Sequence, residues 1–125
     1  MNLVIGMHHA SVVVEDLSRA RGFYEGILGF SPSTDRPALS FDGVWYDIGA
    51  SQIHLLCVPN PEAGLIRPSH VGRDRHLALT VTNLDELRER LDRARIAYTQ
   101  SRSGRNALFC RDPDDNGLEF IAVTV

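Results

Sequence analysis

Three histidines and one glutamate occupy corresponding places in two halves of this sequence: His9 and His54 in the first half, His76 and Glu119 in the second. Imidazole nitrogens and a carboxylate oxygen together suit a borderline divalent ion such as zinc, nickel, cobalt, manganese or ferrous iron. No cysteine belongs to this set, so a closed structural zinc site is not expected. If the two halves pair, the four side chains become candidate ligands of one metal ion with open positions for water or substrate.

The correspondence arises from an internal repeat. Residues 9–17 align without a gap to residues 76–84, and each stretch is followed by an arginine-rich helical pattern. Residues 52–56 have their counterpart in residues 117–121. Such internal similarity indicates one supersecondary unit that occurs twice. A duplicated unit with candidate ligands in each copy favours a shared metal over four unrelated polar residues.

Side-chain periodicity predicts the elements that would position these residues. Alternating apolar residues predict strands at 8–14 and 76–81, with His9 and His76 on the face that carries small side chains. Each strand precedes a helix whose first turn can be capped, by Asp16 in one copy and by Asn83 in the other. The remaining predicted strands lie at residues 30–32, 40–48 and 52–58 in the first copy and at 97–100, 106–111 and 118–124 in the second.

The sequence therefore predicts two βαβββ modules within one domain that covers residues 1–125. Module one takes up about residues 6–58, a proline-containing linker about 59–75, and module two about 76–125. His8 alternates to the face opposite His9, and His70 lies in the linker, where the sequence predicts a solvated side chain. Residues 112–117 are dense in Asp, Asn and Gly, and this composition predicts a tight turn before the last strand.

Composition excludes several classes of function. The net charge of −3 gives no broad positive field for nucleic acid, although all 13 basic residues are arginine. No apolar run is long enough to cross a membrane, and the first residues lack the pattern of a signal peptide, so we expect a cytoplasmic protein. Cys57 and Cys110 stand far apart in apolar strand patterns, which predicts free thiols rather than a disulfide or a metal site.

Four segments together resemble the vicinal oxygen chelate superfamily, which includes glyoxalase I, methylmalonyl-CoA epimerase, extradiol dioxygenases and the fosfomycin- and bleomycin-resistance proteins. The resemblance covers nearly the whole chain, and the combination of segments is specific where any one of them would be weak. The matching segments are His8 to Leu17, Phe23-Tyr24 with Leu28-Gly29-Phe30, Arg75 to Leu79, and Asp112 to Glu119.

The resemblance implies an α+β, glyoxalase-like fold in which two βαβββ modules form a curved mixed sheet around a metal site. It also implies that His9, His76 and Glu119 match the family's ligand positions. One departure concerns His54, because glyoxalase I and the epimerase carry a carboxylate at this position. The paired-glutamate acid and base of those enzymes is therefore incomplete here, and glyoxalase I activity itself is put in doubt.

The predicted site has two catalytic candidates, Glu119 and His54. Glu119 could move a proton when substrate displaces it from the metal, and His54 could serve either as a fourth ligand or as a base. A set of two histidines and one glutamate, with His54 disengaged, would equally resemble the facial triad of oxygen-activating iron enzymes. The substrate-binding candidates are Arg75 and Arg105, whose guanidinium groups suit an anion, and Trp45 or Tyr46, of which only one can face the site.

These residues predict a metal-dependent enzyme that acts on a small, oxygen-rich and anionic molecule. A divalent ion that chelates two neighbouring oxygens of the substrate would serve lyase, isomerase or dioxygenase chemistry. The alternative is a non-catalytic module that binds small molecules, as the bleomycin-resistance proteins do. In both cases we expect a homodimer, because open sheets of this kind leave strand edges that a second copy can cover.

Overall fold

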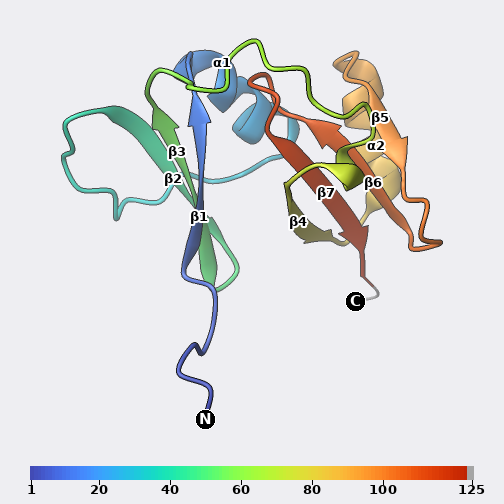
Figure 1. The fold of residues 1–125 in the computed structure, drawn as a ribbon, viewed down its shortest axis with the longest axis horizontal. Coiled ribbons are helices and arrows are strands. Elements are labelled where there is room, and N and C mark those ends of the chain that lie inside the picture. The colour runs from blue at the N-terminus through green and yellow to red at the C-terminus, as the bar shows by residue number, and fades with distance from the viewer. Residues whose placement is uncertain (124–125) are drawn as a thin grey trace. The chain divides into compact units, whose positions relative to one another are not determined.

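The computed structural model describes residues 1–123 and divides them into two units, residues 1–61 and 62–123. Unit 1 contains β1 (His9–Val14), α1 (Leu17–Arg21), η1 (Gly22–Ile27), β2 (Asp42–Ile48) and β3 (Ser51–Cys57). Unit 2 contains η2 (Val71–Arg73), β4 (His76–Val81), α2 (Leu84–Arg93), β5 (Tyr98–Gln100), β6 (Ala107–Arg111) and β7 (Gly117–Ala122). Figure 1 shows the helices and strands of both units.

Each unit has its own mixed sheet. In unit 1 the strand order is β1-β3-β2, with β1 parallel and β2 antiparallel to β3. In unit 2 the order is β4-β7-β6-β5, and β4 runs parallel to β7 in the same way. The predicted α+β fold with two βαβββ-like modules is confirmed, although the structure has two separate sheets where the sequence predicted one curved sheet.

The two modules differ at one predicted strand. Residues 30–32 form no strand in unit 1, and only an isolated bridge joins Pro32 to Tyr46. Pro32 lacks the amide hydrogen that a ladder requires, and Pro37 follows in the same segment, so pairing cannot extend from this bridge. In unit 2 the equivalent strand is present as β5. The last strand was predicted to end at residue 124, which lies outside the described residues.

The predicted helix starts are confirmed. The side chain of Asp16 accepts a hydrogen bond from the amide of Arg19 at 3.0 Å, and that of Asn83 accepts one from Glu86 at 3.0 Å. The first helix passes from α1 into the π-helical turn η1 and ends before Gly29, whose φ of 78° provides the left-handed stop that the sequence predicted. Caps and stops depend on local chemistry, so the sequence alone could predict them.

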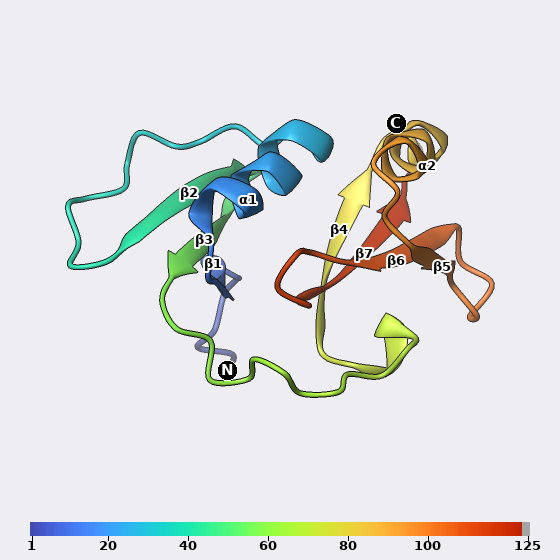
Figure 2. The same cartoon turned by 90° about the horizontal axis from the view of Figure 1, so that it is seen from above.

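An aromatic cluster joins the helix of unit 1 to one face of its sheet. The ring of Tyr24 lies 6.0 Å from that of Tyr46 and 5.7 Å from that of Phe30, measured between centroids. Tyr24 and Tyr46 are both fully buried. Figure 2 shows α1 beside the strands of this sheet. In unit 2 the apolar side chains of α2, Leu84, Leu87 and Leu91, are likewise buried. Each module thus covers one face of its sheet and leaves the other for polar residues.

Tyr46 offers a test of this core. Its hydroxyl donates a hydrogen bond to Glu25 Oε2 at 2.8 Å, and burial followed by this bond raises the pKa of the phenol. Tyr46→Phe removes a hydrogen bond to a charged group, so we expect the free energy of unfolding to fall by about 1–2 kcal/mol. Urea unfolding of the two proteins measures the difference. An unchanged free energy would mean that water serves Glu25 equally well.

Candidate metal centre

In unit 2 the structure brings two of the predicted ligands into contact. His76 opens β4 and pairs with Gly117 of β7, and Glu119 lies two residues further along the same strand. Nε2 of His76 lies 3.1 Å from Oε1 of Glu119. The side chain of Glu119 is only 3% exposed. Gly117 allows this approach, since a Cβ there would lie 2.9 Å from the carbonyl oxygen of Arg75 and 3.2 Å from Cβ of His76.

The hydrogen bonds around His76 fit a metal ligand. Its Nδ1 lies 2.8 Å from the carbonyl oxygen of Asp74, which can only accept, so Nδ1 carries the hydrogen. In the neutral ring Nε2 then holds a lone pair, and this lone pair meets the acceptor oxygen of Glu119. The 3.1 Å contact is a hydrogen bond when a proton lies on either group, and the same two atoms are donors that a metal ion could bind. Metal-binding histidines are commonly oriented by such a backbone carbonyl.

Asp74 fixes the segment that carries this carbonyl. Its carboxylate, about one-tenth exposed, receives hydrogen bonds from Nη2 of Arg67 at 2.8 Å and from Nη1 of Arg111 at 3.0 Å. The hydrogen bonds from Arg67, above all, hold the pKa of Asp74 well below its usual range, at about 2. The network ties the linker to β6 and thereby holds the chain immediately before His76.

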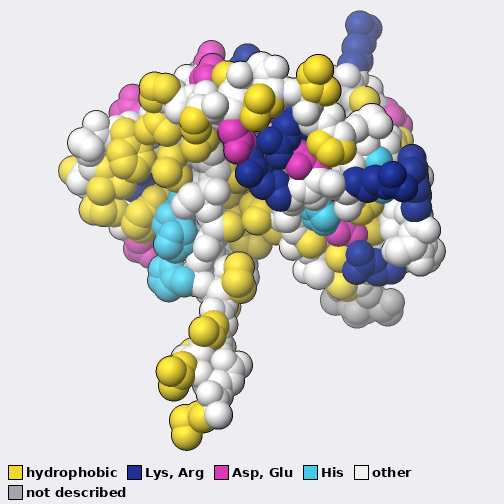
Figure 3. Space-filling model, viewed as in Figure 1, with side chains coloured by type: hydrophobic (Ala, Val, Ile, Leu, Met, Phe, Trp, Pro, Cys, Tyr) yellow, Lys and Arg dark blue, Asp and Glu magenta, His cyan; other side chains and the backbone are white. Residues whose placement is uncertain are grey.

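The two predicted substrate arginines have different positions. Nη2 of Arg105 lies 3.2 Å from Oε2 of Glu119, so its guanidinium group contacts the candidate site. The guanidinium group of Arg75 instead forms an ion pair with Glu62 and is two-thirds exposed. In Figure 3 histidine side chains reach the surface in both units, and in one place they adjoin acidic and basic side chains. Arg105 is therefore the better placed of the two predicted anion-binding residues.

In unit 1 the other two predicted ligands lie in an equivalent arrangement. His9 pairs with Gln52, and His54 lies two residues further along β3, opposite Ser11. The counterpart of Ser11 in unit 2 is Ala78, which lies opposite Glu119. The register of the two modules is thus the same, as the repeat predicted. A small residue on the first strand leaves room above it for the second candidate ligand.

The rings of this site form a stack. The ring of His54 lies between those of His9 and Trp45, at centroid distances of 4.1 Å and 4.0 Å and interplanar angles of 15° and 3°. His54 is 6% exposed. Burial first, and then the charges of His9, His8 and Arg36, lowers the pKa of His54. His54 is therefore held neutral over a wider pH range than an exposed histidine.

Polar partners also hold the edge of the His54 ring. Its Nε2 lies 2.9 Å from Oε1 of Gln52, and Nε2 of Gln52 donates to Oδ1 of Asp47 at 2.9 Å. His8, immediately before β1, makes a further contact, since its Nδ1 lies 2.8 Å from Nδ1 of His9. On this face of the sheet, His54 is thus buried within a set of polar contacts, while His8 and His9 remain exposed.

Of Trp45 and Tyr46, the structure places Trp45 on the face of His54. Tyr46 points to the helix and belongs to the buried aromatic cluster, so it cannot line the site as a substrate-binding residue. The sequence left this choice open because alternation separates two neighbouring residues without saying which side the helix covers. The bulk of Tyr24 and Phe30 on the helix side gives the physical reason.

His70 was predicted to be solvated, and this prediction is wrong. It is 9% exposed, its Nδ1 lies 3.0 Å from Oγ1 of Thr99, and its ring meets that of Phe109 edge-on at 5.0 Å. The ring of Phe109 also meets that of His76 edge-on, at 5.5 Å. Gly72 creates the space, because a Cβ there would lie 2.7 Å from Nε2 of His70. In the sequence, Gly72 was the one feature that could have indicated a buried His70.

Within residues 1–123, no three side chains of His, Cys, Asp or Glu form a group that could hold a metal ion. The predicted ligands form one pair in each unit, and their convergence on one ion stays a prediction. Both cysteines are free, as predicted. Cys110 is buried, and burial raises the pKa of its thiol to about 12, so it is an unreactive core residue.

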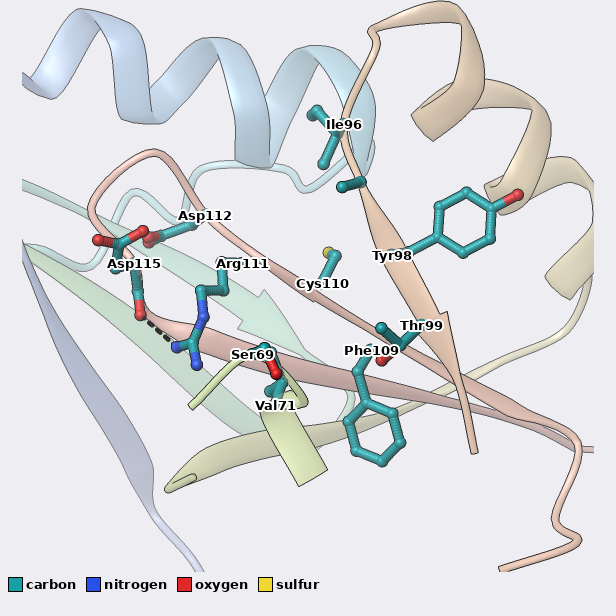
Figure 4. A pocket seen from close by; sticks show the side chains of 11 residues that line it. Ser69, Val71, Ile96, Tyr98, Thr99, Phe109, Cys110, Arg111, Asp112 and Asp115 are labelled. Atoms are coloured by element: carbon teal, nitrogen blue, oxygen red, sulfur yellow. Dashed lines mark hydrogen bonds between the residues drawn. The ribbon is translucent and has the colours of Figure 1, made fainter. Parts of the chain in front are cut away.

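Unit 2 also contains a pocket of about 330 Å³ beside β5 and β6. Figure 4 shows the side chains that line it, including Tyr98, Cys110 and Arg111, with a hydrogen bond from Arg111 to the backbone oxygen of Asp115. None of the predicted site residues lines this pocket. We therefore centre the candidate site on the histidine pairs, where ligand chemistry is present, and not on this cavity.

The chain belongs to the Glyoxalase/Bleomycin resistance protein/Dioxygenase superfamily, whose model matches residues 6–120. It is 27% identical to Glyoxylase I 4 of Arabidopsis thaliana over 119 aligned residues, and the alignment covers 91% of this chain and 68% of that protein. It is 30% identical to the uncharacterized protein YwkD of Bacillus subtilis (strain 168) over 125 aligned residues, and the alignment covers 94% of this chain and 97% of that protein. The resemblance that the sequence motifs suggested is confirmed.

Solved structures show the same fold. One is an E126Q mutant of the fosfomycin resistance protein FosX from Listeria monocytogenes, complexed with Mn(II) and 1S,2S-dihydroxypropylphosphonic acid (TM-score 0.74, 19% identity, 98% of this chain and 95% of that chain). Another is TnmS3, an antibiotic-binding protein from Streptomyces sp. CB03234 (TM-score 0.71, 20% identity, 99% and 100% of the chains). At these sequence identities, the structural similarity shows a shared fold and nothing further.

No helix among residues 1–123 has the length and apolar character needed to cross a bilayer.

Proposed function

We propose that this protein is a metal-dependent enzyme that acts on a small, oxygen-rich and anionic molecule. The observation that carries the proposal is the contact between His76 Nε2 and Glu119 Oε1 at 3.1 Å, with the other ring nitrogen of His76 committed to the carbonyl of Asp74. This arrangement brings an imidazole nitrogen and a buried carboxylate oxygen together, and both are donor types that divalent ions bind. In the proposal, His9 completes the ligand set, as the superfamily's ligand pattern suggests.

A bound divalent ion would supply a Lewis acid that chelates two neighbouring oxygens of the substrate. The protein's own residues would orient the ligands and move the proton. Asp74 fixes the orientation of His76, and Arg105 holds one oxygen of the Glu119 carboxylate. Glu119 is the proton acceptor of the proposal, because its other oxygen can leave His76 and take up a proton from the substrate.

Arg105 also suits the substrate. Its side chain is more than half exposed, with Nη2 in contact with Glu119 and Nε donating to Oγ of Ser103, so Nη1 is the nitrogen of the guanidinium group that an anion would meet. Trp45 covers one face of His54 and gives unit 1 an aromatic surface beside this histidine. These residues favour a small molecule with a carboxylate, phosphate or phosphonate group beside its chelating oxygens.

The choice of metal follows from the donors. Two imidazoles and one carboxylate accept manganese, ferrous iron, cobalt, nickel or zinc, and a related fold is known with Mn(II). We therefore expect activity to appear only after loading with one of these ions. The test is a screen of metal-loaded protein against the methylglyoxal–glutathione adduct, fosfomycin, catechols and acyl-CoA epimers. Turnover of one class that disappears on chelation supports the proposal, and no turnover with any ion contradicts it.

A second candidate is a non-catalytic binding protein, like the antibiotic-binding TnmS3. The part-exposed indole of Trp45 favours it, because planar rings pack well on aromatic side chains and one face of the indole is already held by His54. Trp45 is the only tryptophan of the chain, so its fluorescence reports directly on this face. Metal-free protein that binds planar aromatic compounds with a change in this fluorescence would support the binding protein, and dependence of ligand binding on added metal would support the enzyme.

We further propose that the protein acts as a homodimer. Strands β1 and β4 each occupy one edge of their sheet, with a partner on one side only among the described residues. Open strand edges favour pairing with another copy. Sedimentation at micromolar concentration distinguishes a dimer from a monomer, and a monomer at all concentrations contradicts this part of the proposal.

A further inference from the structure

The stack of His9, His54 and Trp45 restricts which residues can share a metal ion. An imidazole binds a metal in the plane of its ring, at about 2.0–2.1 Å from the nitrogen. The rings of His9 and His54 are nearly parallel, at 15°, with centroids 4.1 Å apart. Stacked atoms keep van der Waals separations of about 3.5 Å or more, so an ion in the plane of one ring is too far from the other. As placed, His9 and His54 cannot bind the same ion.

His54 is the ring that is held in place. Both of its faces are covered, one by His9 and one by Trp45, and its Nε2 contacts Gln52. Turning this ring would break two stacking contacts and a hydrogen bond. His9 is exposed, stacks on His54 with one face, and has a further contact through Nδ1 with the exposed His8, so turning it would break fewer contacts than turning His54. Of the two, His9 is the residue free to act as a ligand.

The hydrogen bonds also define the tautomer of His54. The carboxylate of Asp47 can only accept, so the amide nitrogen of Gln52 must face it. The amide oxygen of Gln52 must then face His54 and accept a hydrogen bond from Nε2. Neutral His54 consequently carries its hydrogen on Nε2 and a lone pair on Nδ1. This lone pair is oriented by the chain Asp47–Gln52–His54.

We infer that His54 is not a metal ligand but a hydrogen-bond acceptor for substrate through Nδ1, with Gln52 and Asp47 as positioning residues that fix its tautomer. The inference rests on the proposed function for its substrate, which would carry a hydroxyl or amide donor next to the chelating oxygens. It gives a role to the one position at which the chain departs from the carboxylate of glyoxalase I and the epimerase.

The test is long-range proton–nitrogen NMR of the histidine rings in metal-free protein near neutral pH. We expect the His54 signals of a ring with hydrogen on Nε2. Gln52→Leu should release the ring to a mixture of both tautomers, and the double variant Gln52→Glu with Asp47→Asn should restore the single tautomer, because it exchanges the roles of the two side chains. Gln100→Leu, an exposed glutamine of the other unit, is the control and should leave His54 unchanged.

Zn(II) titration of the same sample tests the ligand set. We expect the nitrogen shifts of His76 and His9 to move as ligands do, while Nδ1 of His54 keeps its free value. His54→Leu should keep its zinc affinity within about threefold, and His54→Asn serves in its place if the leucine variant does not fold. Hydrogen on Nδ1 in the metal-free protein, or a ligand shift of His54 with zinc, overturns the inference. Failure to bind any metal would overturn the proposed function instead, and the metal-free spectra would still decide the tautomer.

Discussion

His76→Ala should weaken binding of Mn(II) or Zn(II) by about 100-fold or more. Loss of residues that merely orient a ligand already costs about 10–100-fold in metal affinity, so loss of the ligand itself should cost at least as much. The substitution also leaves the nearly buried carboxylate of Glu119 with Arg105 as its remaining charged contact. Isothermal titration calorimetry of the metal-free proteins measures the difference.

The matched control is His70→Asn. His70 is a buried histidine of the same unit, and its ring, like that of His76, meets Phe109 edge-on. Asparagine is a compact polar residue that can also serve Thr99, so we expect metal affinity within a few-fold of wild type. Equal affinity in wild type and His76→Ala would show that the ion binds elsewhere. Equal losses in both variants would show a general loss of structure in unit 2.

Asp74→Asn should lower the free energy of unfolding by about 2–4 kcal/mol. Removing one partner of a buried ion pair leaves the other charge without compensation, and here two guanidinium groups lose the same carboxylate. Arg67 and Arg111 are each less than one-fifth exposed, although both keep other acceptors. Urea unfolding at neutral pH measures the loss. Asp85→Asn, at an exposed pair with Arg88, is the control, with an expected change below about 0.5 kcal/mol.

The same carboxylate predicts an acid response. Its pKa is lowered from 3.8 to about 2 in the folded protein, so its contribution to stability is complete above the unfolded value. This contribution should fade as the pH drops from about 4 toward 2, and Asp74→Asn should lack this part of the acid sensitivity. Parallel loss of stability in both proteins over this range would assign the acid response to other carboxylates.

Much of the fold follows from local signals. Asp16, Asn83 and Gly29 act within one turn of their own position, and the alternation of β1 and β4 reflects a helix on one face of each sheet. The register of the modules, with a small residue opposite each second ligand candidate, follows from the repeat. The loss of the strand at residues 30–32 could have been expected from Pro32, which removes a ladder donor.

The site was predictable only in part. Alternation places His9 and His54 on one face, but it gives no information on ring packing, and the stack with Trp45 depends on contacts across three strands. The burial of His70 depends on the absence of a side chain at Gly72. The role of Arg105, as distinct from Arg75, depends on which acidic partner each guanidinium group meets. These features come from side-chain geometry that sequence spacing does not encode.

The central claim is that one divalent ion binds His76 and Glu119 together with His9. The most direct measurement is anomalous scattering from crystals of the protein loaded with Mn(II) and purified without a metal-affinity tag. We expect one strong peak per chain at ligand distance from Nε2 of His76, from a carboxylate oxygen of Glu119 and from a ring nitrogen of His9, supplied by the same or a partner chain. A manganese-loaded crystal with no peak at His76 and Glu119, or with manganese only at surface carboxylates, would contradict the account.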